Sequence, residues 1–369
     1  MRRGAASIFF KRAKMAAAEV AEASVVASQQ RNDAFTASFP EFVLQQDLGL
    51  FMWNPGPDSN SQLKSFGDVT TEEILSRLHI RNEKHTTLEA KLKKMSLNSS
   101  PPKIDYSYVR FPVRITSLPS QEFPNRFPND PGYIVPLFAA IKSGLGLPEI
   151  DFVLGGSALE VLANRRIDGE DTKYLVQRVH NVIFLVKSKS YILNYADVGF
   201  QFERLVTGGK MEDKHAVEKH EHLQLMKLGD SKVLLSADVD AVDDDGGCVE
   251  IKSGNPRYFG TKVMFQMISS GAQTLIQADK RGPSITGVKK RTIKELCCEH
   301  PKNELQRMQV NILRALTELK SQISEVSDET PSELAFSGSG IKLIPLRERT
   351  SILPAKQVTE ELLSAAKAK

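Results

Sequence analysis

The sequence predicts an α+β fold, in which a single mixed β-sheet core is flanked by helices. Strand-type and helix-type segments alternate through the C-terminal two-thirds of the chain. Turn signals such as DDDGG at 243–247 divide apolar runs into hairpins. Segment 303–323 has the apolar spacing of a long amphipathic helix, with Met308, Ile312, Leu316 and Leu319 on one face.

The N-terminal half gives fewer signals. A helix is expected over VTTEEILSRL (69–78), because Thr70 or Thr71 ahead of acidic residues is a capping-type start. Segment 96–103, SLNSSPPK, is typical of a linker or a long surface loop. From about residue 130 the pattern becomes regular, beginning with a predicted helix over 158–166.

The central segments predict most of the sheet. VIFLVKS (182–188) and YILNY (191–195) read as two strands of a hairpin, and FQFERLV (200–206) as a short helix. KVLLSADVDAV (232–242) and GCVEIKS (247–253) read as strands paired through a turn that contains Asp243, Asp244 and Asp245. A helix over 260–271, ended by Gly271, precedes strands at 274–280 and 285–293.

Bulk composition bounds the class of protein. The chain has 369 residues, 41% of them hydrophobic, which is enough for a large core, and we expect one domain over 36–369. No apolar run approaches the length that spans a bilayer, so no membrane partner is expected. The three cysteines do not form a disulfide framework, which indicates a reducing compartment such as the nucleus or cytoplasm.

Charge is concentrated at the N-terminus. The net charge is +4, yet the first 14 residues carry five bases and no acid, which leaves 44 bases against 45 acids in the remainder. We expect residues 1–35 to be a flexible basic tail, although their composition also fits a mitochondrial presequence. Any anionic partner of the body must therefore be held at a local patch.

The two strands around DDDGG carry an unusual set of charges. In a strand, residues two apart share a face, so Asp238 and Asp240 point one way, as do Glu250 and Lys252. Paired strands would bring three carboxylates together, and the usual remedy for that repulsion is a divalent cation such as Mg²⁺ or Mn²⁺. The alternative is a plain solvent face, which the poor strand propensity of aspartate disfavours.

This spacing resembles the D…(D/E)xK pattern of the restriction-endonuclease-like (PD-(D/E)XK) nuclease core. Glu203, on the predicted helix before the first acidic strand, could add a fourth carboxylate. Lys262 and Gln266 follow at i and i+4 on one helical face that can point back at the sheet. A metal there would activate water and neutralise phosphate, with Lys252 stabilising the developing charge.

Four short segments in this order resemble the DXO family of RNA 5′-end decapping and exoribonuclease enzymes. They are GFQFERL (199–205), ADVDAV (237–242), VEIKSG (249–254) and KVMFQMISSG (262–271), within a metal-site core at about 130–290. The resemblance implies a decapping-nuclease-like domain that binds Mg²⁺ or Mn²⁺. It also implies metal ligands at Glu203, Asp238, Asp240, Glu250 and the main-chain carbonyl of Ile251.

The resemblance further implies that Lys252 and Gln266 hold the scissile phosphate and the attacking water, and that Asp238 contacts metal through water or substrate. The implied activity is hydrolysis of phosphodiester or pyrophosphate bonds at RNA 5′ ends, in quality control of RNA caps. The implied partner is a capped, triphosphate or monophosphate RNA 5′ end, with a protein partner also expected.

Two features depart from the family pattern. Asp238 stands where the family has glutamate, and Gly155–Gly156 stand where an aromatic residue and an RNA-contacting arginine are expected. A missing guanidinium removes a bidentate phosphate contact, so a catalytically altered or inactive paralogue that binds RNA or protein is the alternative. The Gly155–Ser157 turn also resembles that of nucleotidyltransferases, but a plain turn before a helix is preferred, since Asp238 is 82 positions after Gly156.

Overall fold

The computed structural model describes part of the chain. The described residues are 38–53, 78–80, 101–115, 122–123, 134–146, 149–168, 172–188, 193–194, 198–208, 219–254, 260–281, 284–324, 330–338, 340–346, 360, 361 and 364. The predicted tail at 1–35 and nearly all of the predicted helix at 69–78 lie outside them.

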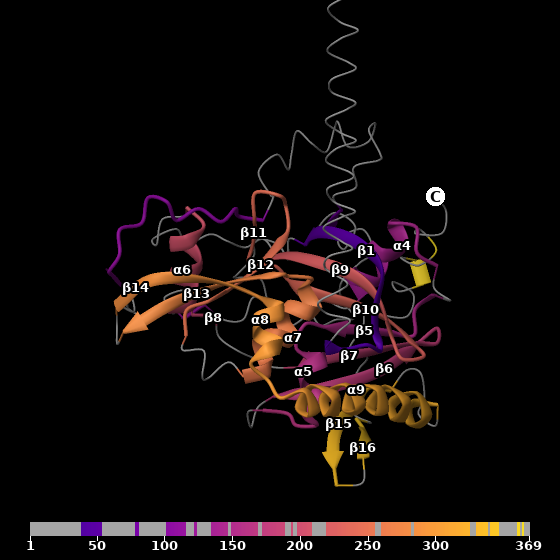
Figure 1. Cartoon of the computed structure of the whole chain (residues 1–369). Coiled ribbons are helices and arrows are strands. Elements are labelled where there is room, and N and C mark those ends of the chain that lie inside the picture. Colours follow the sequence, from indigo (N-terminus) through magenta and orange to yellow (C-terminus); the bar gives the residue numbers. More distant parts are fainter. Residues whose placement is uncertain are drawn as a thin grey trace, which may run out of the picture.

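The body is built on a nine-stranded sheet, here called the large sheet, in the order β16-β15-β6-β7-β5-β10-β9-β1-β2 (Figure 1). β5 is parallel to both β10 and β7, and the other pairings are antiparallel. Its strands are β1 (Phe42–Trp53), β2 (Leu78–Ile80), β5 (Phe152–Gly155), β6 (Lys173–Val179), β7 (Val182–Ser188), β9 (Lys219–Leu228), β10 (Ser231–Asp238), β15 (Ser332–Ser337) and β16 (Gly340–Pro345).

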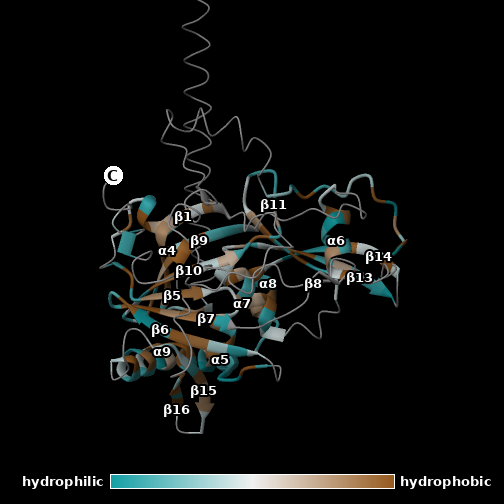
Figure 2. Cartoon of the chain, turned by 180° about the vertical axis from the view of Figure 1, so that it is seen from behind, coloured by the Kyte–Doolittle hydropathy of each residue, from teal (hydrophilic) through white to brown (hydrophobic). Residues whose placement is uncertain are grey.

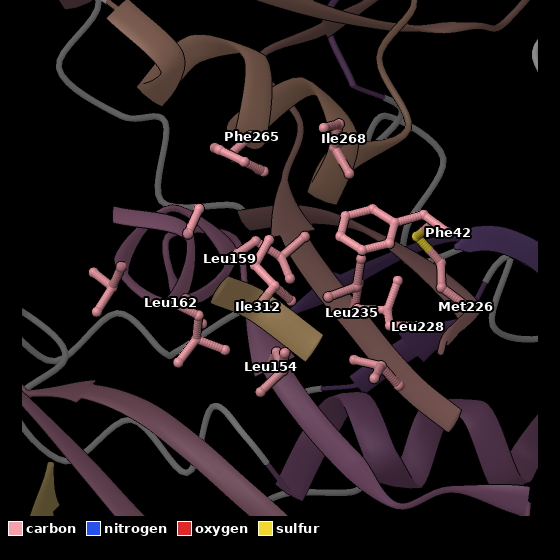
Figure 3. Close-up of a cluster of buried hydrophobic side chains, with 14 of the residues drawn as sticks. Phe42, Leu154, Leu159, Leu162, Met226, Leu228, Leu235, Phe265, Ile268 and Ile312 are labelled. Atoms are coloured by element: carbon pink, nitrogen blue, oxygen red, sulfur yellow. The ribbon is translucent and has the colours of Figure 1, made fainter. Parts of the chain in front are cut away.

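Helices cover both faces of the large sheet. On one face, α5 (Ala158–Asn164), α7 (Gly260–Ser270) and α9 (Lys302–Ile323) pack on β5 and β10. Figure 3 shows the side chains that meet in this core, from Leu154 and Leu235 of the strands to Leu159, Phe265 and Ile312 of the helices. On the other face, α4 (Ile134–Lys142) packs on β10 and its neighbours. Figure 2 shows the central strands β5, β6 and β7 as predominantly hydrophobic, as expected of strands buried on both sides.

A second, five-stranded sheet, here called the small sheet, has the order β11-β12-β13-β14-β3. β13 and β14 extend away from the large sheet (Figure 1). The apolar side chains of α6 (Val198–Val206) pack on one face of this sheet. Its strands are β3 (Val113–Arg114), β11 (Ala241–Val242), β12 (Cys248–Lys252), β13 (Thr274–Arg281) and β14 (Ser284–Thr292), with α8 (Ile293–Cys298) following β14.

The α+β class and the mixed sheet are confirmed, but the strands of the predicted single core sheet are divided between two sheets. The division falls in the predicted strand 232–242, which stops at Asp238 as β10 and resumes at Ala241 as β11. The Asp240 carboxylate accepts a hydrogen bond from the amide of Ile251 at 2.8 Å, so a side chain takes the place of a strand-to-strand bond there. The predicted turn at Asp243–Gly247 still pairs β11 with β12.

The predicted hairpin of 182–188 with 191–195 is wrong. β7 pairs with β6 through a turn at His180 and Asn181, both of which have positive φ, while β8 (Leu193–Asn194) pairs with β4 (Glu122–Phe123). The local signal of two adjacent apolar runs was outweighed by a tighter turn on the other side of β7. Among the described residues, no helix is long and apolar enough to cross a membrane.

Candidate metal and catalytic site

The acidic residues of the candidate site lie where the chain passes from the large sheet to the small one. Asp238 is the last residue of β10, and Asp240 precedes β11. The turn at Asp243–Gly247 then brings β12 back beside them, with Glu250 and Lys252 on the face that packs toward α7. The two sheets thus contribute to one site at their junction.

Three charged side chains make direct contact. Lys252 Nζ forms an ion pair with Glu250 Oε1 and lies 3.6 Å from Asp240 Oδ2. Glu250 is only 4% exposed. The N–H and C=O groups of one strand residue point toward the same edge of the strand. The N–H of Ile251 donates a hydrogen bond to Asp240, so the Ile251 carbonyl is also directed toward the carboxylates.

Burial and mutual repulsion tune these groups. Burial, followed by repulsion from the Asp240 carboxylate, raises the pKa of Glu250 to about 7. Burial lowers the pKa of Lys252, but attraction to Asp240 and Glu250 outweighs it, so the pKa of Lys252 lies above its ordinary value. Lys252 is therefore an ammonium at neutral pH, and it serves as a hydrogen-bond donor rather than a base.

The remaining predicted carboxylates act on this cluster through their charge. Asp238 raises the pKa of Glu250, and Glu203 of α6 raises the pKa of Lys252. Among the described residues, however, no three His, Cys, Asp or Glu side chains converge closely enough to hold a metal ion as they stand. The ammonium of Lys252 lies instead between two of the carboxylates.

One further acid near this site was missed by the sequence analysis. Glu221 of β9 is the register partner of Asp238, and its carboxylate accepts a hydrogen bond from Ser236. Like charges placed opposite each other on neighbouring strands are unfavourable. Glu221 therefore adds to the negative potential at the end of β10.

Gln266 lies on α7 and keeps an unused hydrogen-bonding atom. Its Oε1 is buried and has no partner within the described part of the chain. One helical turn further on, Ser269 donates a hydrogen bond to the Gly156 carbonyl at 3.1 Å, so this stripe of α7 lies over the turn after β5. The role predicted for Gln266 stays a prediction.

The donor chemistry of the site suits a hard divalent cation. Carboxylate oxygens and a strand carbonyl are the ligands that Mg²⁺ and Mn²⁺ prefer. Besides burial, repulsion from the Asp240 and Asp238 carboxylates raises the pKa of Glu250, and a bound cation would relieve that repulsion. The residues therefore fit such an ion, provided that the Lys252 ammonium moves out from between Asp240 and Glu250.

Comparison with models of protein families and with curated proteins finds no match to this chain. Solved structures do match. Candida albicans Rai1 in complex with pU5-Mn²⁺ aligns with a TM-score of 0.57 at 11% identity, over 88% of this chain and 96% of that one. Scheffersomyces stipitis Rai1 in complex with (3′-NADP)⁺ and calcium ion aligns with a TM-score of 0.54 at 10% identity, over 87% and 96%. K. lactis Dxo1 in complex with manganese aligns with a TM-score of 0.53 at 12% identity, over 84% and 92%.

The chain has the Rai1/Dxo1 fold. The coverage shows that this fold accounts for most of the chain and for nearly all of each Rai1 or Dxo1 chain. The fold expected from the resemblance to the DXO family is thereby confirmed.

Within this Rai1/Dxo1 fold, the Gly155–Gly156 turn lies beside the acidic strand. β5 is parallel to β10, with Gly155 in register with Ser236. A Cβ added at Gly156 would lie 3.0 Å from the Cβ of Ala237, so a side chain there would require Ala237 to move by a few tenths of an ångström. The helix that follows, α5, is seven residues long and packs into the core, as expected for a plain turn before a helix.

The acids of the DDDGG turn have a different role from those of the site. Asp243 Oδ1 accepts hydrogen bonds from the amides of Gly247 at 2.7 Å and Asp245 at 3.1 Å. Asp243→Ala is expected to lower the free energy of unfolding by about 1–2 kcal/mol in urea titrations, because two amides lose their acceptor. Asp244 is exposed, and Asp244→Ala is the matched control, with an expected change within about 0.5 kcal/mol. Equal effects of the two changes would contradict this assignment.

Proposed function

We propose that this protein hydrolyses phosphodiester or pyrophosphate bonds at RNA 5′ ends with the help of Mg²⁺ or Mn²⁺. The observation that carries the proposal is the cluster of Asp240, Glu250 and Lys252 at the junction of the two sheets, in which Glu250 is buried. It stands in a fold shared with Rai1 and Dxo1 structures that were solved with manganese or calcium, one of them with pU5.

The chain offers oxygen ligands for such an ion. Glu203, Asp238, Asp240, Glu250 and the Ile251 carbonyl would hold it. When bound, a divalent cation supplies a Lewis acid for the phosphate and an acidified water.

The other residues act on the substrate. Lys252, which remains protonated, would donate hydrogen bonds to phosphate oxygens and stabilise the charge that develops on them. Gln266, with its unused amide oxygen, would accept a hydrogen bond from the attacking water and orient it. The site thus combines one lysine ammonium and one neutral amide beside a set of carboxylates.

A second candidate function is an RNA- or protein-binding paralogue without turnover. It is favoured by the Gly155–Gly156 turn, which carries no arginine and where an added Cβ at Gly156 would lie only 3.0 Å from the Cβ of Ala237. Such a protein would keep the fold and the acidic site but hold RNA more weakly, because a bidentate phosphate contact is absent.

Both candidates are tested with the purified full chain and Mn²⁺ on three RNAs, which carry a cap, a triphosphate or a monophosphate at the 5′ end. Hydrolysis is expected to release pyrophosphate, a cap-derived nucleotide or 5′ mononucleotides, and to stop when EDTA removes the metal. Mn²⁺ alone is expected to raise the Tm, since binding to the folded state stabilises it. Absence of product from all three RNAs, with RNA or protein binding retained, would favour the second candidate.

A further inference from the structure

The small sheet carries a buried amide directly beside Lys252. β12 and β13 are parallel, and Lys252 is the register partner of Gln277. Register partners project to the same face, and neighbouring strands lie about 4.8 Å apart. Gln277 therefore lies next to Lys252, on the face of the sheet that also carries Glu250.

The amide oxygen of Gln277 makes no hydrogen bond within the described part of the chain. The residue is only 1% exposed. A buried polar atom without a partner destabilises a folded protein, and a methionine or leucine would avoid that cost. A partner acquired in another state of the protein gives a physical reason for glutamine at this position.

A cation bound at the carboxylates would force the ammonium of Lys252 to change partners. It carries three N–H donors, and its contacts are with Asp240 and Glu250. These are two of the carboxylates proposed to hold the divalent cation. A cation there would take those acceptors and repel the ammonium, which then needs a new acceptor close by.

We propose that Gln277 is a positioning residue for Lys252, whose ammonium donates a hydrogen bond to Gln277 Oε1 when a divalent cation occupies the carboxylates. This inference rests on the proposed function, since it requires the cation at that site. Gln277 thereby keeps the ammonium within reach of the substrate phosphate while the carboxylates are occupied.

The test is calorimetric titration of the metal-free full chain with Mn²⁺. Gln277→Met is expected to raise the Kd for Mn²⁺ roughly tenfold or more, because the displaced ammonium loses its acceptor. The Tm of the metal-free protein is expected to stay the same or rise, since the variant removes an unpaired buried atom. The matched control is Gln309→Met on α9, where another buried Oε1 has no partner among the described residues. Gln309→Met is expected to leave the Kd unchanged.

The same change made in a Lys252→Met variant shows whether Gln277 acts on Lys252 or only on packing. If Gln277 acts through Lys252, Gln277→Met should have no effect on the Kd once Lys252→Met has removed the ammonium. Gln277→Leu, a second apolar replacement, should reproduce the shift, whereas a shift seen only with methionine would indicate a perturbed fold.

Two results would overturn the inference: an unchanged Kd in Gln277→Met, or the same shift in the Lys252→Met background. If the wild-type protein itself binds no Mn²⁺, the proposed function fails first. Binding and hydrolysis in the wild type with an unaffected Gln277→Met would remove this inference alone.

Discussion

Glu250→Gln is expected to lower the rate of RNA 5′-end hydrolysis by roughly 10²–10³-fold at saturating Mn²⁺. The change preserves the shape of the side chain but removes a buried carboxylate that is 4% exposed and in contact with Lys252. Rates on a 5′-triphosphate RNA, measured with Mn²⁺ at several concentrations, separate a loss of metal affinity from a loss of turnover.

The control for this change is Glu333→Gln on β15. Glu333 is also paired with a lysine, since its Oε2 lies 2.7 Å from Lys173 Nζ, but it lies on a strand of the large sheet at a surface position. Its replacement is expected to leave hydrolysis unchanged. Activity of Glu250→Gln within a fewfold of the wild type would remove Glu250 from the proposed site.

The effect of Glu250→Gln on the Tm is also expected to depend on pH. The pKa of Glu250 is raised from its ordinary value of 4.5 to about 7, so between those values the folded state binds more protons than the unfolded state. Stability from this group is present at low pH and is lost as the pH rises through that window. The Tm of metal-free Glu250→Gln, relative to the wild type, is therefore expected to increase from pH 4.5 to pH 7.

Gly271→Ala is expected to lower the free energy of unfolding by about 3 kcal/mol, the largest stability effect that we expect from a single methyl group here. Gly271 ends α7 with φ of +70°, a conformation that costs an alanine about 1–2 kcal/mol. An added Cβ would also lie 2.8 Å from Nδ1 of the buried His222. His222 is fixed by a 2.8 Å contact with Asp47, so it cannot move aside without cost.

Gly208→Ala separates the two causes. Gly208 has φ of +76°, and an added Cβ there would meet no atom within 4 Å. Only the backbone term of about 1–2 kcal/mol is expected. Urea unfolding of the two variants should therefore differ by the cost of the contact with His222, and equal losses would show that this contact is unimportant.

Segments with a strong local pattern could be predicted from the sequence. The helix over 260–271 and its end at Gly271 match α7, because apolar spacing and a C-terminal glycine are local signals. The contact of Glu250 and Lys252 follows from the two-residue period of a strand. These features need no knowledge of distant parts of the chain.

Features that depend on register could not be predicted. Glu221 reaches the site because β9 and β10 pair it with Asp238, and Gln277 because β12 and β13 pair it with Lys252. In the sequence, neither residue is marked by a local pattern that points to the site. The interruption after Asp238 was equally hidden, since the bond from Ile251 to Asp240 that replaces a ladder bond joins residues 11 positions apart.

The close approach of Gly156 to Ala237 has a consequence for how this chain could change. A Cβ atom at position 156 would lie 3.0 Å from the Cβ of Ala237. It would lie 3.6 Å from the Cα of Ala237, which is an ordinary van der Waals contact. With Ala237→Gly in place, the turn would tolerate a larger residue. Two substitutions therefore separate the present sequence from one with an arginine at position 156. The arginine would be harmful unless Ala237→Gly came first.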